Sequence, residues 1–447
     1  MKKVIAFALS MALCGTLLSG CQSSTTTAAS SAAPADQSSQ AASQAASAEA
    51  PKPTEITVVT SYGGDDGNRQ NYEAAVSAYE KASGNTVKDA SGTSNEEWKA
   101  KVMADFETGA EPDVLFYFNG VDSNKLVQGG KVVSIDDIRK VYPDYANNMK
   151  DDMMGKSPAD GKNYSVPVNG YWEGLYVNKK VLADAGVKVP DATTTWDQFL
   201  QDCEAVKAKG YTPIACSLQE IPHYWFEYTI FNHDTLQTHA TLPTSSTDPA
   251  GANWAAGLND MKTLYTKGYF PKNTITATDA ETFQLMADNK AAFAIDGSWK
   301  LGWFQTNAKS VDDFTVTYVP GANQRKATDI IGGLSMGYYI TKKAWDDPAK
   351  QKAAVSFVEA MTTDSEVSIF GPTAITALKN GTTAPANADS LTKAALALTK
   401  GATGVSPAVQ DGMNQQARTA LFADVKNIVT GKTTAEKAID TALAIKG

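Results

Sequence analysis

The chain has no basic run and no basic cluster. Its 40 Lys and Arg are outnumbered by 49 Asp and Glu, and its formal net charge is −9. Proteins that bind nucleic acid neutralise phosphate groups with clustered Lys and Arg. We therefore expect no nucleic-acid partner.

Cysteine and histidine are scarce, with four Cys and three His in the whole chain. None of them has the Cys-x-x-Cys or His-x-x-x-His spacing that is typical of zinc sites, and we expect neither a metal nor a cofactor. Cys203 and Cys216 are the two cysteines in the folded part of the chain. A disulfide between them would stabilise the fold by about 3 kcal/mol. Two buried free thiols fit the sequence equally well.

Nucleotide-binding and catalytic motifs are also missing. No Gly-x-x-x-x-Gly-Lys-Ser/Thr sequence occurs, so we do not expect the chain to hydrolyse ATP. Gly333-Leu-Ser-Met-Gly337 matches the Gly-x-Ser-x-Gly pattern of hydrolases, but residues 338–341 are predicted to continue as a strand where that motif needs a helix. All three His precede this serine, whereas hydrolases of that fold place the histidine after it. We predict that the protein is not an enzyme, with a secreted glycan-active enzyme as the less favoured alternative.

The N-terminus contains one long apolar run. Met1-Lys2-Lys3 precedes apolar residues 4–18, which are fewer than the roughly 20 needed to span a bilayer. Residues 1–20 are therefore predicted to be a secretory signal peptide. Leu18-Ser-Gly-Cys21 resembles the lipobox of bacterial lipoproteins, which implies that Cys21 carries lipid that attaches the protein to the membrane. An ordinary secretory signal with an incidental Cys is the alternative.

Residues 21–53 consist almost entirely of Ser, Thr, Ala and Gln and contain no aromatic residue. Such a segment cannot bury enough apolar surface to offset its chain entropy. A flexible chain of this length has an end-to-end distance of roughly 30 Å. We predict a disordered tether that holds a folded body away from the outer face of the cytoplasmic membrane, with a periplasmic lipoprotein as the alternative.

From residue 54 onward, strand and helix periodicities alternate. Residues 55–60 and 113–118 are predicted strands, and Trp98, Val102 and Phe106 fall at helical spacing. Further along, Thr195 is predicted to cap a helix that begins at the next residue. Strands that alternate with helices predict an α/β fold with largely parallel sheets, and a body of about 400 residues predicts two domains.

Several segments together resemble the family 1 extracellular solute-binding proteins of carbohydrate ABC importers, a family that includes maltose-binding protein. No segment is diagnostic alone, but their order and spacing match the family over roughly 300 residues. The matching segments are residues 98–116, 164–182, 196–199, 292–299, 332–335 and 354–361.

This resemblance implies a periplasmic-binding-protein-like fold, with two lobes around a central ligand cleft and three crossings between them. The crossings are expected near residues 168–170, 321–328 and 361–366. The N-lobe would then contain residues 54–168 plus 328–362, and the C-lobe residues 169–327 plus 363–447. Ligand bridging the lobes would favour a closed state.

The resemblance also implies a function. A monomer would bind an extracellular mono- or oligosaccharide in the cleft and deliver it to ABC permease subunits in the membrane. A sugar acid, peptide or polyamine remains an alternative cargo.

Aromatic side chains are the first candidates for the ligand site, because a sugar's C–H faces pack on flat rings. Trp299 matches a position where the family commonly stacks a sugar, and core packing is the alternative role for each candidate. The strand that ends near Asn119 is included because open α/β sheets bind ligands at the carboxyl ends of their strands. These candidates are Trp299, Trp172, Trp225, Tyr224, Tyr117 and Asn119.

Polar groups that could bind sugar hydroxyls form the second set. Acidic side chains on loops are usually only solvated, and Asp296 could instead cap its own loop. Gly333 would let the backbone approach ligand closely, although a tight turn explains it equally well. The set comprises Asp65, Asp66, Asp296, Glu173 and Gly333.

Overall fold

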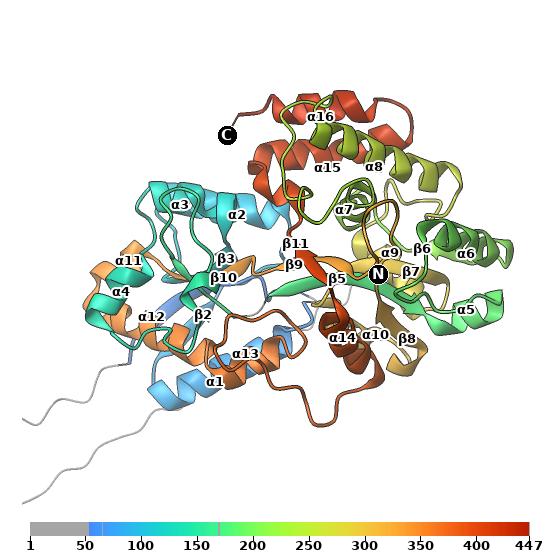
Figure 1. The fold of residues 1–447 in the computed structure, drawn as a ribbon. Coiled ribbons are helices and arrows are strands. Elements are labelled where there is room, and N and C mark those ends of the chain that lie inside the picture. The colour runs from blue at the N-terminus through green and yellow to red at the C-terminus, as the bar shows by residue number, and fades with distance from the viewer. Residues whose placement is uncertain (1–52, 65, 169, 447) are drawn as a thin grey trace, which may run out of the picture. The chain divides into compact units, whose positions relative to one another are not determined.

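The computed structural model describes residues 53–64, 66–168 and 170–446. The predicted signal peptide, Cys21, nearly all of the tether and Asp65 lie outside the described residues. Residues 52–447 belong to one compact unit, which contains two separate β-sheets covered by helices (Figure 1). None of the helices described is both long enough and apolar enough to cross a membrane.

The first sheet forms the centre of the N-lobe. Its first three strands are parallel, and β10 runs antiparallel to both of its neighbours. In order across the sheet, the strands are β2 (Thr86–Asp89), β1 (Glu55–Val59), β3 (Val114–Phe118), β10 (Met336–Ile340) and β4 (Ser165–Pro167).

Helices cover both faces of this sheet. Side chains of β3 alternate between two apolar clusters, so that Phe116 packs with α1 and α12 while Tyr117 packs with α2. The N-lobe helices are α1 (Arg69–Ser83), α2 (Glu96–Thr108), α3 (Asn124–Gln128), α4 (Ile135–Val141), α11 (Lys342–Asp346), α12 (Pro348–Met361) and α13 (Asp364–Phe370), with 3₁₀ turns η1 (Gly120–Ser123) and η2 (Asp151–Met153).

The second sheet forms the centre of the C-lobe and is less parallel than predicted. Its long central strand β5 runs antiparallel to β7, β8 and β9, and only the outer pairs β6–β7 and β11–β9 are parallel. The strands are β11 (Gly404–Ser406), β9 (Asp329–Gly333), β5 (Tyr171–Asn178), β7 (Ala291–Gly297), β6 (Thr212–Ile214) and β8 (Phe314–Thr317).

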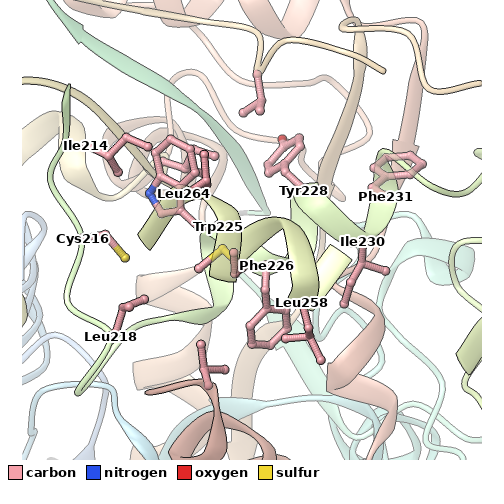
Figure 2. Packing of buried hydrophobic residues seen from close by; sticks show 14 of the residues in the cluster. Ile214, Cys216, Leu218, Trp225, Phe226, Tyr228, Ile230, Phe231, Leu258 and Leu264 are labelled. Atoms are coloured by element: carbon pink, nitrogen blue, oxygen red, sulfur yellow. The ribbon is translucent and has the colours of Figure 1, made fainter. Parts of the chain in front are cut away.

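The C-lobe core lies between this sheet and a layer of helices in which α7, α8, α15 and α16 pack together (Figure 1). Aromatic and aliphatic side chains of α7 fill its centre, as Figure 2 shows. The helices are α5 (Lys179–Ala185), α6 (Trp196–Ala208), α7 (His223–Phe231), α8 (Pro249–Thr266), α9 (Asp279–Ala287), α10 (Lys300–Asn307), α14 (Ser390–Gly401), α15 (Gln415–Val429) and α16 (Ala435–Leu443), with η3 (Val311–Asp313) and η4 (Val409–Gly412).

The C-lobe contains the predicted cap of α6 and the two cysteines of the folded part of the chain. The Thr195 side chain accepts a hydrogen bond from the Gln198 backbone N–H, and the Gln198 side chain accepts one in return, which confirms the predicted cap of α6. Cys203 and Cys216 are free, buried thiols rather than a disulfide. Burial raises the pKa of both thiols well above the usual value.

Within the described residues the chain changes sheets three times, and the first change lies between β4 and β5. The second lies between β9 and β10, at residues 334–335, later than the predicted 321–328. Residues 321–328 are instead held within the C-lobe. The backbone carbonyl of Gly321 accepts a hydrogen bond from Trp196, and the guanidinium of buried Arg325 donates to the carbonyls of Val319 and Pro320.

The third change also lies later than the predicted 361–366. After α12 the chain starts another N-lobe helix, α13, because the Thr363 side chain caps it by accepting from Glu366 N–H. Leu378 still packs in the N-lobe core, whereas α14 packs on β8 of the C-lobe. The predicted lobe boundaries at 328 and 362 therefore do not coincide with these changes of sheet.

Candidate functional site

A cavity of about 410 Å³ is lined by residues of both lobes. The N-lobe contributes hydroxyl and amide side chains together with aromatic rings and a few charged groups. The C-lobe contributes aromatic and acidic side chains from β5, α7, and the segment after β7. N-lobe lining residues include Ser61, Asn68, Asn71, Thr93, Phe116 and Phe118, and C-lobe lining residues include Tyr171, Glu173, Tyr224, Glu227, Asp296 and Trp299.

Strand β5 brings two side chains to the cavity. Successive side chains of a strand point to opposite faces, so Tyr171 and Glu173 share one face and Trp172 points to the other. Tyr171 and Glu173 line the cavity. Trp172 is fully buried, and its indole N–H lies 3.4 Å from the Thr373 hydroxyl.

Helix α7 supplies the next three cavity residues from one of its faces. His223, Tyr224 and Glu227 are spaced so that they lie close together on a helix, and all three line the cavity. Trp225 lies in the C-lobe core, as Figure 2 shows. It does not line the cavity, and its ring packs on that of Phe199.

Glu173 and Glu227 form a pair of buried carboxyl groups in this cavity, with 1% and 0% of their surface exposed. The Gln410 amide donates to Oε1 of Glu227, whereas Oε2 of each glutamate has no donor partner when both are ionised. Burial, helped by the nearby carboxylate of Asp296 and opposed by a hydrogen bond with Glu227, raises the pKa of Glu173 to about 8. Burial and the charge of Glu173 likewise raise the pKa of Glu227. The pair therefore holds at least one proton at neutral pH.

Asp296 is a third buried acid, at the end of β7. Its Oδ1 accepts from the Gly297 backbone N–H at 2.7 Å, and Lys300 Nζ lies 3.6 Å from Oδ2. Burial raises its pKa to about 7, while the Lys300 charge partly opposes that effect. Lys300 Nζ also lies 3.0 Å from Asp279, so positive and negative groups lie together in this corner of the cavity.

Trp299 is the centre of an aromatic group beside these acids. Its ring centroid lies 6.1 Å from that of Tyr171 and 5.7 Å from that of Tyr224. The indole also lies against Gly297, where an added Cβ would come within 2.2 Å of the ring. A larger residue at position 297 would therefore displace the indole from the cavity wall.

His223 is a neutral group in this cavity at physiological pH. Burial, together with the charges of Lys99 and Arg418, lowers its pKa to about 3. Its Nδ1 has no partner among the residues described. Its ring stacks on Phe422 with the centroids 4.6 Å apart, so the imidazole is fixed in orientation.

An ionic network joins the lobes beside the cavity. The guanidinium of Arg418, on α15, contacts Asp122 of the N-lobe at 2.8 Å and Glu96 at 3.5 Å. Lys99 Nζ lies 3.0 Å from Glu96 and 3.4 Å from Asp122. Arg418 is 1% exposed, so these charges are satisfied by one another rather than by solvent.

Comparison with known proteins identifies the family. The family of bacterial extracellular solute-binding proteins matches residues 63–367. The chain belongs to this family. It is also 29% identical over 137 residues to the multiple sugar-binding protein of Streptococcus mutans serotype c, an alignment that covers 26% of this chain and 32%, about a third, of that protein's length.

Two solved structures illustrate the fold of this solute-binding protein. A chitin oligosaccharide binding protein is similar with a TM-score of 0.75 and 25% identity, over 88% of this chain and 97% of that one. The solute-binding protein RafE in complex with raffinose is similar with a TM-score of 0.67 and 17% identity, over 87% and 98%. The predicted two-lobe α/β fold is thus confirmed.

The structure divides the predicted site residues of this solute-binding protein into two groups. Trp299, Tyr224, Asp66, Asp296 and Glu173 line the cavity, whereas Asp65 lies outside the described residues. The other five do not line it: they are Trp172, Trp225, Tyr117, Asn119 and Gly333.

Each of these five has another structural role. Trp172, Trp225 and Tyr117 are core residues that point away from the cavity, and Tyr117 packs on Trp98 behind the sheet. The Asn119 side-chain oxygen accepts hydrogen bonds from the hydroxyls of Ser165 and Tyr339. Gly333 pairs with Tyr171 at the end of β9, next to the crossing between the lobes.

Sequence reasoning missed Tyr171, His223 and Glu227. Strand alternation gave a usable signal for Tyr171, because it must share a face with Glu173. Glu227 is the only acidic residue in the apolar sequence His223–Phe231. A charge at such a position is rarely buried without a role, so it indicated a functional group.

Proposed function

We propose that this solute-binding protein binds a carbohydrate in the cavity and delivers it to an ABC permease. The observation that carries the proposal is the position of the Trp299, Tyr171 and Tyr224 rings beside buried carboxyl groups with free hydrogen-bonding capacity. Rings can pack against the C–H faces of a sugar, and the carboxyl groups can bind its hydroxyls.

The comparisons support this proposal because similar proteins are named for sugars: multiple sugars, chitin oligosaccharide and raffinose. Binding rather than catalysis also fits the local structure. Ser335 of the Gly-x-Ser-x-Gly sequence lies between strands β9 and β10, without the helix that a nucleophile elbow requires.

Transport further requires that the two lobes close on the ligand. Since the cavity has walls from both lobes, a bound sugar would contact both and favour the closed state by its differential affinity. The permease would then recognise the closed monomer.

The same proposal includes attachment to the membrane. The signal peptide, the lipid on Cys21 and the tether of residues 21–53 would place the folded body at the outer face of the cytoplasmic membrane. Globomycin treatment of the producing bacterium would leave the signal peptide uncleaved if this is correct, and Cys21→Ser would release the protein from membranes.

The test of sugar binding is thermal unfolding of the purified protein against mono- and oligosaccharides, sugar acids, peptides and polyamines. Ligand at a hundredfold over its Kd stabilises the native state by about 2.7 kcal/mol. The proposal predicts a shift of the midpoint by several degrees with one group of sugars. A response to peptides or to polyamines alone would contradict it.

A further inference from the structure

We propose that the carbohydrate carries a primary amine and that its ammonium group binds between Glu173 and Glu227. This inference rests on the proposed function and specifies the class of sugar. It follows from two adjacent, buried carboxyl groups that line the ligand cavity without a basic partner.

The protein holds both carboxyl groups in place from different elements. The Tyr228 hydroxyl donates to the backbone carbonyl of Glu173 at 2.8 Å, which ties α7 to β5. Gln410 occupies Oε1 of Glu227. The buried Oε2 atom of each glutamate thus has no donor partner among the described residues. Only a proton held by the pair itself can satisfy these two oxygens.

The basic side chains around the cavity are engaged with other acids. Lys300 contacts Asp279 and Asp296, while Arg418 and Lys99 contact Asp122 and Glu96. Within the described residues, neither Glu173 nor Glu227 forms a salt bridge. The other charged groups that act on the pair are Asp296 and Asp411, and both carry the same sign as the pair.

An ammonium group fits this position better than a hydroxyl or an acetamide. Two adjacent buried carboxylates cannot both ionise, and a shared proton relieves only part of their repulsion. An ammonium group brings a full positive charge and three N–H donors, so it can displace the shared proton and bond both Oε2 atoms. A hydroxyl brings no charge, and an acetamide has one N–H donor and adds an acceptor oxygen.

The aromatic group favours the same ligand. The Trp299, Tyr171 and Tyr224 rings lie next to one another in the cavity that the acidic pair also lines, and the charges of the pair act on both tyrosines. Ring faces attract a cation within about 6 Å. The same rings can stack on a pyranose. An amino sugar satisfies both the acidic pair and the rings, whereas a simple polyamine would leave the rings without a flat partner.

Matched ligands test this inference directly. We would titrate the wild-type protein by calorimetry with sugars that differ only in one substituent: an amine, an acetamide or a hydroxyl. Glucose and galactose series would be used as monomers and as oligomers, together with putrescine. The inference predicts that the amine member binds at least about tenfold more tightly than its two counterparts.

Proton release gives an independent readout. At about pH 6 the pair holds at least one proton, and an ammonium ligand should expel about one proton or more, measured from titrations in buffers of different ionisation enthalpy. A hydroxyl sugar should release none. Equal or tighter binding of hydroxyl or acetamide sugars, without proton release, would overturn the inference and leave the proposed function intact. Binding of putrescine alone, or of no sugar, would overturn both.

A variant locates the effect. Glu227→Gln keeps the side-chain shape and removes one acid, so the amine preference and the proton release should be lost. Glu436→Gln, an exposed residue on α16, is the control for net charge and should retain both. A Glu227→Gln protein with wild-type thermal unfolding and an unchanged amine preference would also overturn the inference.

Discussion

The two walls of the cavity differ in chemistry. The C-lobe wall has aromatic rings and buried acids on regular elements, including Glu173 on β5 and Glu227 on α7. The N-lobe wall mixes hydroxyl and amide groups, such as Thr93 and Asn68, with several aromatic rings, and its Phe118 ring lies beneath Lys99 Nζ at 3.9 Å. We infer that the C-lobe, which carries the buried acid pair, contributes more to ligand selection than the N-lobe.

The largest expected effect concerns the contact that joins the walls. Arg418→Met would leave the acids Asp122 and Glu96 with one cation, Lys99, in place of two, and we expect the free energy of unfolding to fall by about 3 kcal/mol. Urea unfolding would measure it. Lys101→Met is the control, since its pair with Asp105 is exposed and should contribute less than about 1 kcal/mol. Equal losses in the two variants would show that the network does not tie the lobes.

The second prediction compares one ring from each wall. Trp299→Ala should weaken sugar binding by about 2–3 kcal/mol, or roughly 30- to 150-fold, because it removes the central ring of the C-lobe group. Phe118→Ala should cost less than about 1 kcal/mol, because Lys99 already covers that ring. Calorimetry with the tightest sugar would measure both. A larger loss for Phe118→Ala would reverse the roles of the two walls.

The third prediction concerns the pH dependence that the C-lobe acids impose. Burial holds the pKa of Glu173 at about 8, and that of Glu227 is also raised, whereas both are near 4.5 when unfolded. The folded state therefore binds protons more tightly, and the stability from this pair is lost as pH rises from about 4.5 through 8. Glu227→Gln should make the free energy of unfolding fall less steeply with rising pH, by up to about 1.4 kcal/mol per pH unit.

Urea unfolding between about pH 5 and pH 9 would measure these slopes, with Glu436→Gln as the control. The N-lobe wall contains no comparable buried acid pair among the described residues. An identical slope in wild type and Glu227→Gln would mean that the two carboxyl groups do not interact.

The smallest expected effect comes from the N-lobe wall. The Asn71 amide donates to Asn68 Oδ1 at 2.9 Å, and both residues line the cavity. Asn71→Ala should weaken sugar binding by less than about 1 kcal/mol, the usual contribution of one neutral hydrogen bond. A loss as large as that of Trp299→Ala, measured by the same titration, would place selection in the N-lobe as well.

Much of the fold and part of the site could be predicted from the sequence. Strand and helix periodicities and the Thr195 cap are local signals, and the order of the matching segments indicated the family. The side of a strand that faces the cavity is not a local signal. A shift of one position exchanges Tyr171 for Trp172, and the same shift separates Phe116 and Phe118 from Tyr117.

Other features depend on tertiary contacts that no short segment contains. The proximity of Glu173 to Glu227 arises only when α7 docks on β5 through the Tyr228 hydroxyl. The position of the third change of sheet also depends on tertiary contacts. Leu378 packs in the N-lobe core although α13 has already ended at Phe370, so the chain reaches the C-lobe later than predicted.

The most direct test of the account is a crystal structure of the protein with the tightest-binding sugar. We predict a sugar ring packed against Trp299, with polar groups of the ligand within hydrogen-bonding distance of Glu173 and Glu227 Oε2. Ligand bound mainly by N-lobe loops, or in the separate groove beside Trp196 and Asn323, would contradict selection by the C-lobe wall.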